Sequence, residues 1–331
     1  MQFCYVYILQ SLARPDHLYA GLTDDLRDRL RRHNAGEVAH TTKFRPWRIK
    51  CWDYYGIWTP ELFAAASLAD LGYAGLAFAY VVDLRRGYDV EQTRIRLPPR
   101  RIELPRSSEA GTAIFEDARL RLRFSAAAGR REVNVSAPRF DRGRGLFIDM
   151  VLNETAAHES MVIATPMGGD RFYYNRKINC LPAHGTIRWG ERSIDATATL
   201  ALGQLDWGRG VWPYRSHWIW ASANGFLRDG RAIGLNLGGG FGDLSHATEN
   251  ALILDGCVHK LAAVDFDFDP SNYQAGWRCT DGDARFDATL VTHTERIART
   301  NLGVIRSEVH QVFGHYHGWV ISDDGERVEL S

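Results

Sequence analysis

The sequence contains few cysteines, and their spacing is irregular. Five cysteines are scattered over 331 residues, and no two of them form a Cys-x-x-Cys pair. An odd number of isolated cysteines does not fit a disulfide framework or a structural zinc site. We therefore expect reduced thiols and a cytoplasmic protein.

Long apolar runs and a net charge are also missing. The most apolar window, residues 63–82, carries Asp70 and two glycines, whereas a transmembrane helix needs about 20 almost uninterrupted apolar residues. The chain does not open with a basic segment followed by a long apolar run, so neither a membrane span nor a secretory signal is expected. Forty Lys and Arg balance forty Asp and Glu, so the overall charge predicts no polyanionic partner.

From Cys51 onward, short apolar and alternating segments are separated by Gly, Pro, Asp and Asn. This spacing predicts an all-β sandwich or barrel. Further along, Asn224-Gly225 and Asp229-Gly230 predict two turns before an apolar strand at residues 232–237. The expected strands in the first part lie within residues 52–58, 62–84, 113–126, 131–138, 145–153 and 160–166.

The densest aromatic stretch runs from Leu205 to Asp243, and four of the ten tryptophans lie in its first half. Trp218 and Trp220 are two residues apart, so on a strand both indoles point to the same face. Indoles beside charged side chains predict a deep pocket for a ring-bearing or polyene ligand, and an ordinary aromatic core is the alternative. The candidate ligand-binding residues are Trp207, Arg209, Trp212, Arg215, His217, Trp218 and Trp220.

Two carboxylates are candidates for acid catalysis. A reaction that protonates an alkene needs a carboxylic acid kept neutral by an apolar wall, with aromatic faces beside the resulting cation. Asp206 and Glu249 are the candidate acids, and the tryptophans are the candidate faces. Arg209 is close to Asp206 in the sequence, so it is expected to lower the pKa of Asp206 or to form a structural ion pair with it.

Histidines near the C-terminus form the pattern His-x4-His-x-His, which begins at His310. His315 and His317 share one face if this segment is a strand, and such a pair can chelate zinc or iron. The sequence offers no third ligand at a fixed spacing, so no metal site is predicted and the two histidines are weak candidates only.

The first fifty residues resemble the N-terminal half of the GIY-YIG nuclease domain. The resemblance rests on YVYIL, YAG, the segment TDDLRDRLRRHNAG with its helix start at Thr23-Asp24-Asp25, and HTTKFRPW. It implies catalytic roles for Tyr7, Tyr19, Arg29 and His33, a DNA substrate and Mg²⁺.

The family's next helix carries a metal-binding glutamate, and the nearest candidate here is Glu61, within a segment that Thr59-Pro60 could open as a helix. A strand at residues 60–71 would instead mean a truncated and inactive nuclease fragment.

Residues 50–331 resemble an uncharacterised bacterial family that is similar to lipocalin-like carotenoid hydratases and tocopherol cyclases. The resemblance rests on YYNRKINCLPAHG, DWGRGVWPYRSHWIWASANG, ENALILDG and HQVFGHYHGWVISDDG. It implies a mainly β protein with two lipocalin-like lobes, at residues 51–190 and 191–331, behind the GIY-YIG-like fragment at 1–50.

The function expected from the second resemblance is binding of an apolar, lipid-like small molecule without a cofactor. A cyclase- or hydratase-like transformation of that molecule is left open. The alternative is a Mg²⁺-dependent GIY-YIG endonuclease that acts on DNA, with the β region as an accessory module.

Overall fold

The computed structural model describes residues 5–10, 18–23, 25–34, 48–97, 102–169, 171–213, 215–301 and 306–331. Its N-terminal part consists of the antiparallel strands β1 (Tyr5–Gln10) and β2 (Leu18–Thr23), followed by α1 (Leu26–Asn34). Asp25 caps α1, because its Oδ1 accepts a hydrogen bond of 2.9 Å from the backbone N–H of Asp28. The predicted helix start is therefore confirmed.

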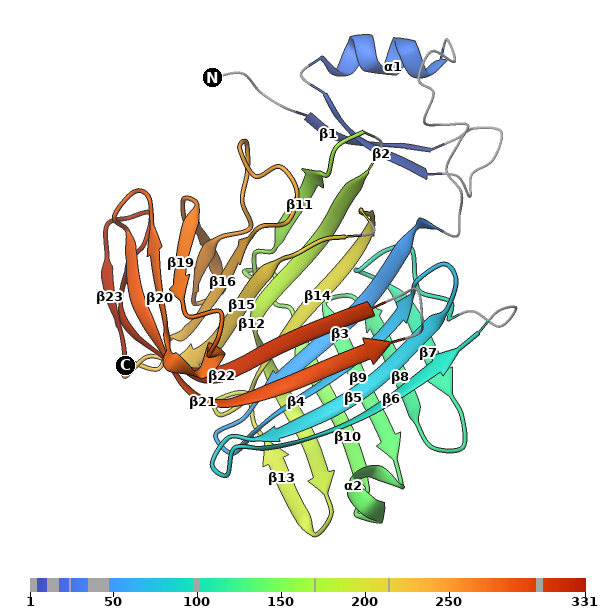
Figure 1. Cartoon of the computed structure of the whole chain (residues 1–331), viewed down its shortest axis with the longest axis vertical. Helices are drawn as coiled ribbons and strands as arrows, with labels where there is room; N and C mark the ends of the chain where they lie inside the picture. The colour runs from blue at the N-terminus through green and yellow to red at the C-terminus, as the bar shows by residue number, and fades with distance from the viewer. Residues whose placement is uncertain are drawn as a thin grey trace.

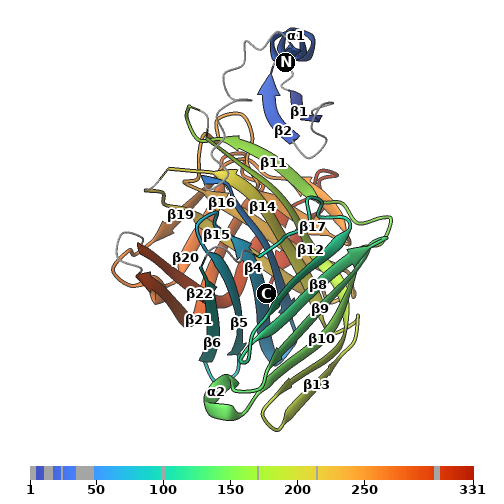
Figure 2. The ribbon, with the colours of Figure 1, turned by 90° about the vertical axis from the view of Figure 1, so that its right-hand side faces the viewer.

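Twelve strands form one antiparallel sheet, which we call the large sheet (Figure 1). Its main path is β6-β5-β4-β3-β14-β12-β10-β9-β8-β7, and both β11 and β13 pair with β12. The sheet curls, so that β4–β6 and β8–β10 form two walls (Figure 2). The strands are β3 (Lys50–Trp58), β4 (Leu62–Asp70), β5 (Gly75–Asp83), β6 (Tyr88–Arg96), β7 (Gly111–Glu116), β8 (Arg121–Ala127), β9 (Arg130–Ala137), β10 (Leu146–Asn153), β11 (Met161–Pro166), β12 (Phe172–Trp189), β13 (Arg192–Ala196) and β14 (Leu202–Val211), and the short helix α2 (Phe140–Gly143) precedes β10.

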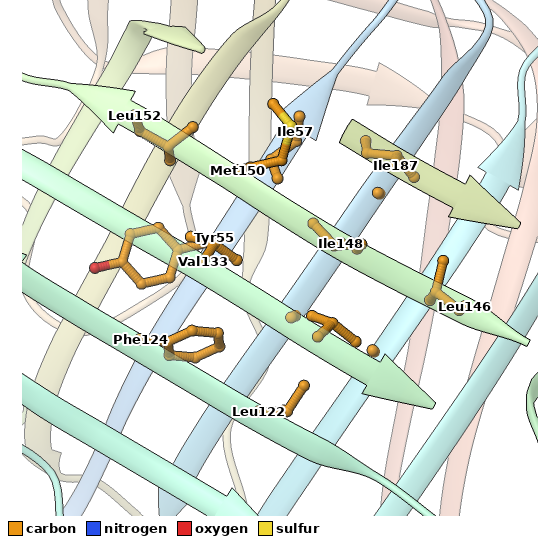
Figure 3. Packing of buried hydrophobic residues seen from close by; sticks show 14 of the residues in the cluster. Tyr55, Ile57, Leu122, Phe124, Val133, Leu146, Ile148, Met150, Leu152 and Ile187 are labelled. Atoms are coloured by element: carbon orange, nitrogen blue, oxygen red, sulfur yellow. The ribbon is translucent and has the colours of Figure 1, made fainter. Parts of the chain in front are cut away.

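Alternating apolar residues fill the inside of the curl. On β9 every second residue is buried, and the same period of two recurs on β10, as expected for strands with one face in a core. Tyr55 of β3 lies across the core from Phe124 of β8, with their ring centroids 5.0 Å apart (Figure 3). A pocket on this inner side, beside Asp53 and Trp207, has a volume of only 10 Å³. The inside of the large sheet is therefore a packed core.

Two smaller antiparallel sheets lie against the other face of the large sheet. The long hairpin of β21 and β22 crosses the large sheet in front of β3–β6 (Figure 1). The small sheet contains β15 (Ile219–Phe226), β16 (Ala232–Gly239), β17 (Ala251–Leu254) and β18 (Cys257–Lys260). The C-terminal sheet contains β19 (Val264–Phe268), β20 (Trp277–Asp281), β21 (Phe286–Asn301), β22 (Arg306–Ile321) and β23 (Arg327–Leu330), with the 3-10 turn η3 (Tyr273–Ala275) between β19 and β20.

The mainly β class predicted from the sequence is confirmed. Both β13 and β14 belong to the large sheet, so the expected lobe boundary at residue 190 falls inside that sheet. The turn predicted at Asn224-Gly225 is wrong, because β15 continues to Phe226 and pairs there with Ala232. The turn at Asp229-Gly230 is present between β15 and β16.

Residues 62–70 form strand β4 in the middle of the large sheet. The helical interpretation of the segment that starts at Thr59-Pro60 is therefore wrong. The apolar residues Phe63–Ala66 and Leu68 explain the outcome, because a central strand covered on both faces needs mostly apolar side chains. Among the described residues, no helix is long and apolar enough to cross a membrane.

Candidate functional site: a cavity between three sheets

A cavity of about 1640 Å³ lies on the outer face of the large sheet, where the small and C-terminal sheets cover it. Residues from β3, β5 and β14 form one wall, and residues from β15, β16 and the β21–β22 hairpin form the opposite walls. Side chains of the large sheet reach this face because they alternate with those that point into the packed core. Its aromatic lining includes Tyr54, Trp58, Phe63, Phe78, Tyr80, Trp218, Trp220, Phe313 and Tyr316.

Gln204 of β14 is the centre of a polar group in this wall. It lines the cavity although only 3% of its surface is exposed. Its Oε1 accepts hydrogen bonds from Ser222 Oγ at 2.6 Å and from Asn224 Nδ2 at 2.9 Å. The Trp58 indole N–H donates to the same oxygen at 3.5 Å. The amide therefore joins the large sheet to β15.

A second polar chain crosses the cavity wall from β3 to β21. The hydroxyl of Tyr54 lies 2.9 Å from that of Tyr80, and Tyr80 donates to Gln311 Oε1 at 3.0 Å. Arg296 also donates to Gln311 Oε1, and its guanidinium lies 3.9 Å from the centroid of the Tyr80 ring. Arg296 forms an ion pair with Glu91 of β6. These contacts hold the β21–β22 hairpin on the large sheet.

Behind the Trp220 indole lies a buried cluster of charges. Lys177 Nζ is 2.9 Å from Glu249 Oε2, 3.9 Å from Asp206 Oδ2 and 4.3 Å from the centroid of the Trp220 ring. The Trp52 indole N–H donates to Asp206 at 3.2 Å. The Asn175 side-chain amide donates to Glu249 at 3.1 Å. The cluster thus connects β12 and β14 of the large sheet to Glu249, which lies two residues before β17 of the small sheet.

Burial raises the pKa of Asp206, and the negative charge of Glu249 raises it further, while Lys177 opposes both effects. The expected effect of Arg209 on this carboxyl is wrong. Asp206 and Arg209 are three residues apart on β14, so their side chains point to opposite faces of the strand. Arg209 instead contacts Asp53 at 3.2 Å.

The seven candidate ligand-binding residues do not all meet in one place. His217, Trp218 and Trp220 line the cavity. Trp207 and Arg209 lie on the core side of β14, where the guanidinium is 4.1 Å from the indole centroid.

The other two candidates lie elsewhere. Trp212 packs edge-on against Trp52, with the ring centroids 5.5 Å apart, and Arg215 is exposed. Neither of them is among the described residues that line the cavity.

The candidate metal ligands are also engaged elsewhere. Glu61 accepts a hydrogen bond from Arg192 at 3.1 Å, and His315 Nδ1 lies 2.7 Å from His293 Nε2. His317 lies nearby on β22. Within the described ranges no group of three or more His, Cys, Asp and Glu side chains is arranged to hold a metal ion.

The residues named by the nuclease resemblance lie on β1, β2 and α1. The side chains of Tyr7, Tyr19 and His33 are outside the described part of the chain, so the structure does not place them. Arg29 is described and lies in the middle of α1, with its backbone N–H bonded to the Asp25 carbonyl at 3.0 Å. The geometry of that predicted site therefore stays a prediction.

Sequence reasoning missed Lys177 and Gln204. A signal for both exists in the alternation of polar residues. Asn175, Lys177 and Asn179 occupy one face of β12, and all three are buried. A polar stripe at a period of two inside an otherwise apolar segment indicates a buried polar interface between sheets.

Comparison with known proteins identifies the family of this chain. The model of a domain of unknown function, DUF2804, matches residues 26–331. The chain belongs to this family. The predicted resemblance to an uncharacterised family is thereby confirmed, although the DUF2804 match begins at residue 26 within α1 rather than near residue 50. The nuclease resemblance finds no support in these comparisons.

Two solved structures are similar to this DUF2804 protein at low identity. A protein from Nitrosomonas europaea, provisionally assigned as AttH, is 16% identical with a TM-score of 0.49, over 82% of this chain and 90% of that chain. Kievitone hydratase from Nectria haematococca is 10% identical with a TM-score of 0.44, over 80% of this chain and 87% of that chain. No curated protein matches the sequence.

Proposed function

We propose that this DUF2804 protein binds an apolar, ring-bearing small molecule in the cavity between its three sheets. The observation that carries the proposal is the composition of that cavity. Its volume is about 1640 Å³, and aromatic side chains from three sheets line it together with a few polar groups such as Gln204. Small-molecule sites typically combine apolar and aromatic walls with a small number of polar groups.

The size of the cavity favours an extended ligand. Drug-sized ligands occupy pockets of roughly 300–1000 Å³, and this cavity is larger. A ligand with one or more rings and an apolar chain would fill more of it than a compact polar metabolite. Each 100 Å² of apolar ligand surface removed from water would contribute roughly 2.5 kcal/mol, before the cost of lost freedom.

Binding is a better-supported function than acid-catalysed transformation. Neither Asp206 nor Glu249 is among the described residues that line the cavity, whereas Trp220, whose ring centroid is 4.3 Å from Lys177 Nζ, does line it. A proton donor must come within about 3 Å of the atom that it protonates. The two carboxylates are therefore assigned to the contact between the sheets, and the cavity to ligand binding.

The test is native mass spectrometry of gently purified protein, followed by organic extraction of the bound material. We expect a stoichiometric apolar adduct in the wild type and its loss in the Trp218→Ala and Trp220→Ala variants. Trp319→Ala is the matched control, because this indole lies on β22 outside the cavity lining.

Titration of the stripped protein with N-phenyl-1-naphthylamine is the second readout. Fluorescence of this apolar probe should rise with the wild type and with Trp319→Ala, and much less with Trp220→Ala. An adduct-free wild type that also leaves the probe fluorescence unchanged would refute the proposal.

A further inference from the structure

The orientation of the Gln204 amide follows from hydrogen bonds in which one partner can only donate or only accept. The backbone N–H of Cys180 can only donate, and it donates to Asn224 Oδ1 at 2.7 Å. The other end of the Asn224 amide is then Nδ2, which donates to Gln204 Oε1. The amide of Gln204 therefore presents its oxygen to β15 and its nitrogen away from it.

A second route leads to the same orientation. Asn179 Nδ2 donates to the carbonyl of Leu235 at 3.3 Å and to Ser222 Oγ at 2.8 Å. Because Ser222 Oγ accepts from Asn179, its own proton is free to bond Gln204 Oε1. The Trp58 indole, which can only donate, points at the same oxygen.

The Gln204 Nε2 group is left as a donor. Within the described part of the chain it has no hydrogen-bond acceptor, although its residue is 97% buried, as its exposed fraction of 3% shows. It lies above Gly56, where a Cβ atom would come within 3.0 Å of Nε2. Because Gln204 lines the cavity, an acceptor on a bound ligand can bond this donor there in place of water.

Resting on the proposed function, we propose that Gln204 determines the ligand's polar chemistry: its Nε2 donates to a carbonyl-type oxygen on the bound molecule. The ligand class is then an apolar ring-bearing ketone, ester or amide, rather than a pure hydrocarbon or an amine. The aromatic groups are placed to hold the rest of such a molecule, since Trp58 contacts Gln204 directly and Trp220 lies two residues before Ser222 on the same face of β15. The chain of bonds behind Gln204 polarises its N–H groups and strengthens the donor.

A matched pair of probes isolates the hydrogen bond. 2-Acetylnaphthalene carries the carbonyl, and 2-isopropenylnaphthalene has the same shape with a CH₂ group in place of the oxygen. Affinities for both are measured by quenching of the intrinsic tryptophan fluorescence. The quantity compared is the ketone-to-alkene affinity ratio, which cancels their common burial.

We expect this ratio to fall about five- to tenfold in Gln204→Leu, as is typical for loss of one neutral hydrogen bond. Gln92→Leu is the control, because its amide bonds the Arg119 carbonyl on the face of β6 opposite the cavity-lining Glu91 and Thr93, and its ratio should equal that of the wild type. The infrared carbonyl stretch of the bound ketone should also shift to higher frequency in Gln204→Leu. An unchanged ratio and an unchanged stretch would overturn the assignment of Gln204.

Gln204→Glu covers the case in which the leucine variant does not fold. It keeps the inner acceptor for Ser222 and Asn224 and replaces only the Nε2 donor. Burial should raise the pKa of the introduced carboxyl, and the affinity ratio should fall as that carboxyl ionises with rising pH, while the wild-type ratio stays flat.

The remaining outcomes separate the two proposals. If the affinity ratio falls in Gln311→Leu but not in Gln204→Leu, Gln311 is the donor and the assignment of Gln204 is refuted. If every variant binds both probes with the same ketone-to-alkene affinity ratio as the wild type, this inference is overturned and the proposed function stays intact. Failure of the wild type to bind either probe would overturn both.

Discussion

Lys177 Nζ lies 2.9 Å from Glu249 Oε2, and this contact joins the large sheet to the small sheet inside the protein. Lys177 is 3% exposed, and 14% of the Glu249 side chain is exposed. The second carboxylate, Asp206, is 3.9 Å from the same ammonium. One ammonium group therefore pairs with two carboxylates, so its removal should lower the free energy of unfolding more than removal of either carboxylate.

Lys177→Met should lower the free energy of unfolding by about 3–5 kcal/mol, because both carboxylates would stay buried without their cation. Glu249→Gln is the matched control. It keeps an acceptor for Asn175 and leaves the Lys177–Asp206 pair in place, so it should cost less. Urea unfolding followed by circular dichroism measures both. A methionine variant as stable as the wild type would show that the cluster is not a stabilising contact.

The stability of the protein should depend on pH through Asp206. Burial raises the pKa of this carboxyl in the folded protein above its ordinary value of 3.8, so the folded state binds the proton more tightly than the unfolded state. Its ionisation therefore costs stability above the folded pKa, and the cost disappears as the pH falls toward 3.8. The stability of Asp206→Asn relative to the wild type should consequently increase as the pH rises from 3.8 through the raised folded pKa.

Asp229→Asn is the control for that pH series, because its stability relative to the wild type should change with pH in the opposite direction. Hydrogen bonds from the backbone N–H and the guanidinium of Arg231 lower the pKa of Asp229. This carboxyl therefore adds stability above its unfolded pKa, and its contribution is lost as the pH falls. Urea unfolding at several pH values checks both variants, and parallel curves for Asp206→Asn and wild type would contradict the assigned pKa direction.

Gly56→Ala should weaken ligand binding and the fold together. A Cβ at this position would lie 3.0 Å from Gln204 Nε2 and 3.0 Å from Phe63 Cε2. Overpacking of this kind typically costs about 1–3 kcal/mol, and it would also displace the amide that faces the cavity. Gly282→Ala is the control, since nothing lies within 4 Å of its Cβ position. Thermal unfolding and the naphthylamine titration measure the two effects.

The thiols should react in a fixed order with iodoacetamide. Among the four cysteines that the structure describes, Cys257 is exposed and should be modified first. Burial raises the pKa of the Cys51 thiol to about 11 and that of Cys279 to about 12, and it also raises the pKa of the buried Cys180. Because the thiolate is the reactive form, these three should react only slowly before unfolding. Peptide mass spectrometry over time checks the order, and early modification of Cys180 would contradict the buried position.

The strands of the large sheet could be predicted because their cause is local. Alternation of apolar residues on β9 and β10, and the mostly apolar side chains of β4, specify an extended chain with one or two covered faces. The same period of two would have separated Asp206 from Arg209, and the polar stripe around Lys177 indicates a buried interface. These are consequences of strand geometry that need no partner.

What only the tertiary structure decided is which strands face one another. Asn224-Gly225 has the composition of a turn, but Asn224 accepts the Cys180 N–H and donates to Gln204, so tertiary hydrogen bonds hold it inside β15. Lys177 and Glu249 are distant in sequence and meet only because the small sheet packs on the large one. The sequence by itself determined a mainly β chain. The cavity and its polar groups depend on how three sheets pack together, which local patterns do not encode, because side chains far apart in the chain supply each wall.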